Sequence, residues 1–108
     1  MPDLKSNELE ALRKLKEALA ADCQLVELRL FGSKARGDSR PESDLDVLIV
    51  LKEVDRQTRR RVSVLCCDLS IDHRVVITPI LYSLAEFTSS RTRVTPFYRN
   101  VEREGVAV

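Results

Sequence analysis

The sequence predicts one α/β (α+β) domain, in which a small mixed β-sheet is flanked by helices in the order α-β-β-α-β-α-α. Three observations predict this class. Apolar residues at helical spacing give way to strict alternation, one short segment is apolar on both faces, and cap residues precede three later helical stretches. The 108 residues suffice for one core but not two, so residues 1–108 are expected to form a single domain.

Composition narrows the functional classes. The chain is 44% hydrophobic and 32% charged, with a net charge of +1, which argues against direct nucleic-acid binding through bulk positive charge. Its apolar runs are too short to span a membrane, and the polar N-terminus does not resemble a signal peptide. The three cysteines lack metal-ligand spacing, and their odd number predicts reduced thiols and a cytoplasmic location.

The first helix is expected to begin within residues 6–10, with Asn7 as its cap and Glu10 closing a capping box. Its apolar stripe comprises Leu9, Leu12, Leu15 or Lys16, and Leu19. Alternation then predicts a strand that ends at Phe31, with Val26, Leu28 and Leu30 on its buried face.

A polar loop is expected over residues 32–43, before a second strand at Leu45–Leu51. This strand is apolar on both faces except at Asp46, which predicts a central position in the sheet. A third strand over residues 74–82 contains Pro79, which cannot donate to a ladder and favours an edge or a break.

Three further helix starts carry cap signals. Asp55 precedes a stripe of Val62, Leu65, Cys66 and Leu69. Ser83 and Glu86 form a capping-box pattern. Thr95, followed by a proline, begins a last helix that is expected to stop at Gly105.

The candidate chemistry lies in two short segments. Gly32 and Ser33 follow a strand directly, where backbone N–H groups and a hydroxyl can cradle phosphate. Asp44 and Asp46 occupy alternate positions at a strand start, so their carboxylates share a face and would repel each other without a cation such as Mg²⁺. Taken separately, a Gly-Ser turn and a strand-start aspartate are usually structural features. Their combination favours a functional site.

The motif Gly32-Ser33, ten intervening residues, then Asp44-Leu45-Asp46 resembles the signature of the superfamily that includes DNA polymerase beta. Its fuller form, Gly-Ser-x-Ala-Arg-Gly followed by Ser-Asp-Leu-Asp, is similar to that of the minimal nucleotidyltransferases, as is the segment at 97–106. The resemblance covers essentially the whole chain and implies a nucleotidyltransferase fold.

The resemblance also implies roles for individual residues. Gly32 and Ser33 would bind the triphosphate of ATP or another nucleoside triphosphate. Asp44 and Asp46 would be the catalytic residues and the ligands of two Mg²⁺ ions, for which Mn²⁺ could substitute. Two roles for Arg36 are predicted about equally well. Its guanidinium could contact the phosphates of the nucleotide, or it could form an ion pair with an acidic residue of the loop, Asp38 or Glu42.

The sequence departs from the family pattern at one point. The resemblance implies that family members with full activity usually supply a third carboxylate from the strand after the second helix, but residues 74–80 contain none. Val76 or Thr78 stands where it is expected, and Asp68 and Asp72 fit poorly. This departure predicts slow transfer with retained nucleotide binding.

The resemblance implies a stand-alone antitoxin that attaches AMP to a tyrosine of a HEPN-domain partner, alone or in a homo- or hetero-oligomer. One alternative is a nucleotide-binding module that neutralises its partner by contact, and another is a transferase acting on a small molecule. The basic stretch at 56–61 is either a solvated face or a site for RNA or an acidic partner. His73 is expected to be a loop residue rather than a metal ligand.

Overall fold

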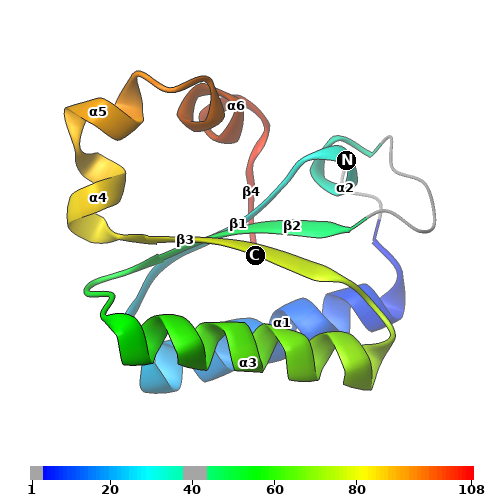
Figure 1. Cartoon of the computed structure of the whole chain (residues 1–108). Helices are drawn as coiled ribbons and strands as arrows, with labels where there is room; N and C mark the ends of the chain where they lie inside the picture. The colour runs from blue at the N-terminus through cyan, green and yellow to red at the C-terminus, as the bar shows by residue number, and fades with distance from the viewer. Residues whose placement is uncertain (1–3, 38–43) are drawn as a thin grey trace.

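A four-stranded mixed sheet lies between two helical layers in the computed structural model, which describes residues 4–37 and 44–108 (Figure 1). The strands are β1 (Leu25–Phe31), β2 (Leu45–Leu51), β3 (Ile77–Ser83) and β4 (Val106–Ala107), in the spatial order β3-β2-β1-β4. β1 is antiparallel to β2 and β4, whereas β2 and β3 are parallel. The helices are α1 (Ser6–Asp22), α2 (Ser33–Arg36), α3 (Arg56–His73), α4 (Leu84–Thr88), α5 (Ser90–Arg93) and α6 (Pro96–Glu104).

The predicted fold class is confirmed, and β2 occupies the predicted central position. α1 and α3 lie side by side on one face of the sheet, and α4, α5 and α6 lie on the other (Figure 1). The side chains of β2 alternate between two cores. Leu45, Val47, Ile49 and Leu51 join the core under α1 and α3, and Leu48 and Val50 join the smaller core under α4 and α6. β3 is an edge strand, which accommodates Pro79.

Most predicted helix ends are confirmed. Asp55 accepts a hydrogen bond from Thr58 N at 2.7 Å, and Ser83 and Glu86 form the expected capping box. α6 begins after Thr95 and ends before Gly105. No helix in the described ranges is long and apolar enough to cross a membrane.

α1 begins at Ser6, within the predicted range, but the predicted cap residues are wrong. Lys5 is the N-cap residue, and the Glu8 carboxylate accepts a hydrogen bond from Lys5 N at 2.8 Å, so Glu10 does not close the box. The Asn7 side chain instead donates to the carbonyl of His73 at 2.9 Å. His73 is the last residue of α3 and not, as predicted, a loop residue. The bond from Asn7 to its carbonyl therefore joins α1 to α3.

Two residues predicted to be buried are exposed. Leu9 is 53% exposed, because α1 turns Glu8, Ala11 and Leu12 toward the core instead. Val26 is 48% exposed because the β1–β2 register shifts between Leu25 and Glu27. A bulge of this kind turns one side chain away from the face that alternation assigns to it.

Three short elements are absent from the predicted order. The structure forms α2 within the segment expected to be a loop, adds α5 between α4 and α6, and pairs β4 with β1. Residues 38–43 of the predicted loop lie outside the described residues. Elements of two to four residues are shorter than one period of a hydrophobic pattern, so alternation and helical spacing do not detect them.

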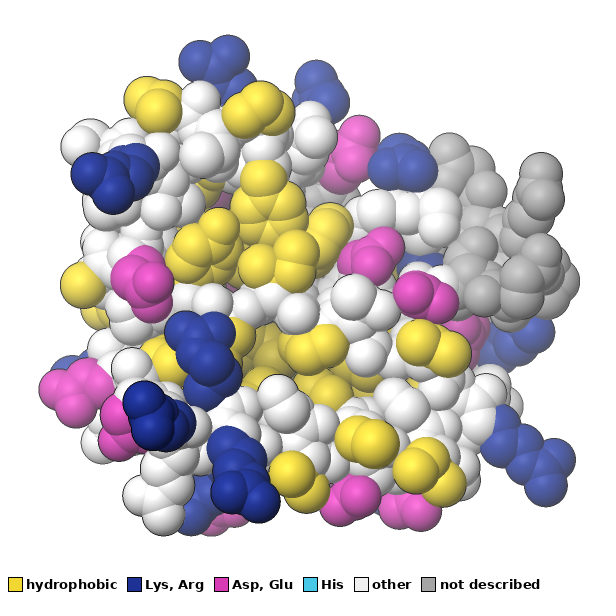
Figure 2. Space-filling view, viewed as in Figure 1, with side chains coloured by type: hydrophobic (Ala, Val, Ile, Leu, Met, Phe, Trp, Pro, Cys, Tyr) yellow, Lys and Arg dark blue, Asp and Glu magenta, His cyan; other side chains and the backbone are white. Residues whose placement is uncertain are grey.

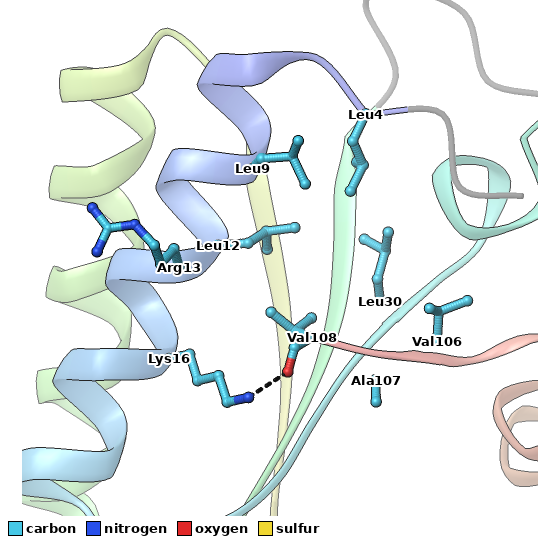
Figure 3. Close-up of a pocket in the computed structure, with 9 residues that line it drawn as sticks. All are labelled: Leu4, Leu9, Leu12, Arg13, Lys16, Leu30, Val106, Ala107 and Val108. Atoms are coloured by element: carbon cyan, nitrogen blue, oxygen red, sulfur yellow. Dashed lines mark hydrogen bonds between the residues drawn. The ribbon is translucent and has the colours of Figure 1, made fainter.

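An apolar hollow of about 700 Å³ lies between α1 and β4 (Figure 3). Lys16 spans it and donates to the carbonyl of Val108 at 2.6 Å. Leu30 lines this hollow from the face of β1 that α1 covers, which is the opposite face of the sheet from Asp46. The hollow is therefore separate from the motif residues.

The three thiols are free. Cys66 belongs to the core as predicted, and burial raises its pKa to about 11, whereas Cys67 is exposed.

A buried ion pair fastens α2 to α1. Lys34 Nζ lies 3.0 Å from Glu8 Oε2, and the two side chains are only 2% and 5% exposed. Ala35, the next residue, packs into the aliphatic core. α2 is therefore held by a charged contact and an apolar contact, even though a single helical turn is unstable in isolation.

Lys34→Met should destabilise the protein by about 3–5 kcal/mol, because it leaves the Glu8 carboxylate buried without its counter-charge. Adding Glu8→Gln should recover much of that loss, since glutamine removes the buried charge and can still cap α1. Urea-induced unfolding measures both variants. Equal losses in the single and double variants would show that the buried charge is not what destabilises the protein.

Candidate functional site

Gly32 brings the backbone of the motif directly against Asp46. It lies between β1 and α2 with φ 77° and ψ −157°, a conformation that side-chain-bearing residues rarely adopt. A Cβ atom at this position would lie 2.6 Å from Asp46 Oδ2. The register explains the contact, because Phe31 pairs with Asp46 and the chain passes the carboxylate as it leaves β1.

Asp44 and Asp46 lie on the sheet face that α6 partly covers. Asp44 is exposed just before β2, and Asp46 is the second residue of β2 and partly buried. Burial raises the pKa of Asp46, the negative charge of Asp44 raises it further, and Arg36 opposes the shift. The charge of Asp44 therefore opposes ionisation of Asp46, as their alternate spacing predicts.

Thr78 contacts the carboxylate pair from β3. It is the parallel neighbour of Asp46, and its hydroxyl donates a hydrogen bond to Asp44 Oδ2 at 3.1 Å. Val76 lies before β3, with its carbonyl bonded to Leu45 N and its side chain 54% exposed. Of the two positions predicted for a third acid, Thr78 rather than Val76 is therefore the one that contacts the Asp44 carboxylate.

Arg36 forms an ion pair with a residue far away along the chain. Its Nη1 lies 3.1 Å from Glu104 Oε2, near the end of α6. Asp38 and Glu42, the predicted partners, lie outside the described residues. Glu104 is 68 positions away along the chain, so no local pattern indicates this pair. It joins α2 to α6 beside the carboxylates.

Ser33 is the first residue of α2 and is partly exposed. The carbonyls of Gly32 and Ser33 accept backbone hydrogen bonds from Arg36 and Gly37, so the turn is closed by its own backbone. Because Lys34 and Ala35 hold α2 to the core, the position of this turn is set by folding.

The carboxylate pair suits a hard cation. Among the described residues, no group of three His, Cys, Asp or Glu side chains is placed to hold a metal ion. Two adjacent carboxylates are nevertheless a common protein contribution to Mg²⁺, which takes its other ligands from substrate phosphates and water. A bound cation would also relieve the repulsion that raises the pKa of Asp46.

Comparisons identify the family. Residues 12–99 match the nucleotidyltransferase domain family, and the chain belongs to this family. A relative from Methanocaldococcus jannaschii, named putative protein adenylyltransferase MJ0604, is 38% identical over 101 residues, which cover 92% of this chain and 95% of the relative. The chain is thus a nucleotidyltransferase, as its motif predicts.

Solved structures share the fold. A structure described as a putative minimal nucleotidyltransferase is 28% identical, with a TM-score of 0.58 and coverage of 93% of this chain and 95% of that chain. A toxin–antitoxin structure with AMP-PNP is 20% identical, with a TM-score of 0.60 and coverage of 95% and 72%.

Gly32→Ala should abolish nucleotide binding, because the new Cβ would displace the Asp46 carboxylate and the positive φ would strain the backbone. Gly37→Asn is a matched control, since Gly37 also has a positive φ but lies in the left-handed region that asparagine tolerates. Calorimetric titration with ATP and Mg²⁺ measures both variants. Normal affinity in Gly32→Ala would show that the contact with Asp46 is not required.

Proposed function

We propose that this protein transfers AMP from ATP to a tyrosine hydroxyl of a partner protein, a HEPN-domain toxin, with release of pyrophosphate and the hydroxyl proton, and thereby acts as its antitoxin. The observation that carries the proposal is the approach of Gly32 to Asp46, which brings a phosphate-binding type of turn against a carboxylate pair. The name of MJ0604 supports the reaction class. The toxin–antitoxin structure with AMP-PNP, an analogue of ATP, supports the nucleotide and the kind of partner.

In the proposed site, Gly32 and Ser33 hold the triphosphate through backbone N–H groups and the Ser33 hydroxyl. Arg36 lies close enough to lower the pKa of Asp46, and we propose that its guanidinium also binds the phosphates. The Arg36 side chain is 43% exposed in its ion pair with Glu104, so a phosphate could approach the guanidinium from solvent.

Asp44 and Asp46 would hold Mg²⁺, with Mn²⁺ as a substitute. When bound, this ion would supply a Lewis acid that neutralises phosphate charge and makes the acceptor hydroxyl easier to deprotonate. Thr78 orients Asp44 by hydrogen bonding to one of its carboxylate oxygens. This role is one of positioning, which accounts for much of catalysis in such transfers.

A second candidate is a nucleotide-binding module that neutralises its partner by contact alone. The specific observation in its favour is that Thr78, which contacts Asp44 and pairs with Asp46, supplies a hydroxyl and not a carboxylate. The two candidate functions differ in whether AMP becomes covalently attached to the partner. Incubation with α-labelled ATP, Mg²⁺ and a candidate HEPN-domain partner, followed by mass spectrometry, separates them. AMP on a partner tyrosine supports transfer, whereas neutralisation without label supports the binding module.

Asp44→Asn and Asp46→Asn should each abolish Mg²⁺-dependent transfer, because one uncharged amide replaces a cation ligand. The metal-free Asp46→Asn variant should be at least as heat-stable as the wild type. A raised pKa means that folding disfavours the ionised Asp46, so its contribution to stability falls as pH rises. Labelled-ATP assays and thermal melts measure the two effects. Full transfer by either variant would contradict the site assignment.

Thr78→Asp should increase the transfer rate, because it places a third carboxylate beside Asp44 and Asp46. It should also lower the metal-free melting temperature through added repulsion, and Mg²⁺ should restore it. Val76→Asp is the control, since residue 76 lies outside β3. Rates compared at saturating ATP test the pair. A gain in Val76→Asp alone would show that position 76 faces the reacting groups.

A further inference from the structure

All five aromatic residues of the chain lie on the sheet face that carries Asp46. They are Phe31, Tyr82, Phe87, Phe97 and Tyr98. The core on the opposite face, under α1 and α3, contains no aromatic side chain among the described residues. This segregation is more than packing requires, because the aliphatic core shows that the sheet can be covered without rings.

Three of these rings form a row that starts beside the carboxylates. Phe31 pairs with Asp46, so the two side chains share a face on adjacent strands. Phe97 packs edge-on against Phe31, with ring centroids 5.3 Å apart and an interplanar angle of 82°. Tyr82 follows, 6.2 Å from Phe97. We call Phe31, Phe97 and Tyr82 the aromatic row.

The aromatic row is partly exposed, whereas Phe87 is only 7% exposed. Figure 2 shows hydrophobic side chains at the surface between the α4–α6 layer and the sheet, next to acidic side chains. Leu48, Val50 and Val101 are fully buried beneath, so the small core is already closed. The exposed ring surfaces remain available to a planar ligand.

The aromatic row extends from the carboxylates over a distance comparable to the length of a nucleotide. Tyr82 pairs with Val50, four residues along β2 from Asp46, which corresponds to about 13 Å. A nucleotide whose phosphates lie at the Gly32 turn and the carboxylates extends over a comparable length. Its base is tethered to those phosphates and must lie within this radius, and the aromatic row offers partly exposed rings for stacking within it.

We propose that the aromatic row holds the base of the nucleoside triphosphate by stacking, which rests on the phosphate-binding site proposed above. Stacking tolerates every base, because each has a π-face. Purines present a larger face than pyrimidines, so ATP and GTP should bind more tightly than CTP and UTP. The row would thereby set the purine preference of the site, while the carboxylates and the Gly32 turn hold the phosphates.

The test separates base binding from phosphate binding. Phe97→Leu and, on a different element, Tyr82→Leu are titrated by calorimetry with Mg²⁺ and either ATP or inorganic triphosphate. Each variant should lose between about 5-fold and 150-fold in ATP affinity. Triphosphate affinity should not change. Tyr98→Leu is the matched control, because Tyr98 packs against the buried Phe87 and outside the row, and it should leave both affinities unchanged.

A second measurement does not depend on removing a ring. The chain contains no tryptophan, so Phe97→Trp provides a single indole fluorophore in the row. ATP should quench or shift its emission, and inorganic triphosphate should leave it unchanged.

Several results would overturn the proposal. Equal losses for ATP and triphosphate would mean that the rings only support the fold. Unchanged ATP affinity in both leucine variants, with transfer to the acceptor lost, would assign the row to an aromatic acceptor side chain. Wild-type protein that binds neither ligand would instead overturn the proposed function itself.

Discussion

The close approach of Gly32 to Asp46 is the constraint on which the site depends. The β1–β2 register sets it, because Phe31 lies opposite Asp46 and the next residue must pass the carboxylate. α2 could drift away from this contact, since one turn of helix has little stability of its own. The buried Glu8–Lys34 pair prevents that by tying α2 to α1. Core packing therefore fixes the distance between the turn and the carboxylates before any ligand binds.

The two faces of the sheet serve different purposes. The face under α1 and α3 is aliphatic and closed, which is the arrangement expected of a core that stabilises the fold. The other face carries Asp44, Asp46 and every aromatic ring, and α6 covers it only in part. Burial and the charge of Asp44 make the ionised Asp46 side chain destabilising to the folded state, as its raised pKa indicates. A destabilising charged residue of this kind is typical of a functional site.

Elements with strong periodicity and clear caps could be predicted from the sequence. The motif also predicted the family to which the chain belongs. The bounds of β2 could be predicted because six apolar residues, interrupted only by Asp46, form one continuous run. Errors arose where a local choice is decided by distant contacts. Glu8, rather than Glu10, caps α1 because Lys34 draws it into the interior, and Arg36 pairs with Glu104 across 68 positions. The bulge at Val26 follows from the register with β2, which β1 alone does not encode.

Thr78 changes the electrostatics of the proposed site. A carboxylate at this position would add a third negative charge beside a pair that already repels itself, and it would destabilise the fold whenever no cation is bound. A hydroxyl instead donates to Asp44 and removes that penalty. Because the Thr78 hydroxyl is uncharged, it neutralises none of the charge of a bound cation. The phosphates of the nucleotide must then supply more of the negatively charged ligands. Under the proposed function, cation and nucleotide binding would therefore be strongly coupled, because each completes a site that the protein leaves partly open.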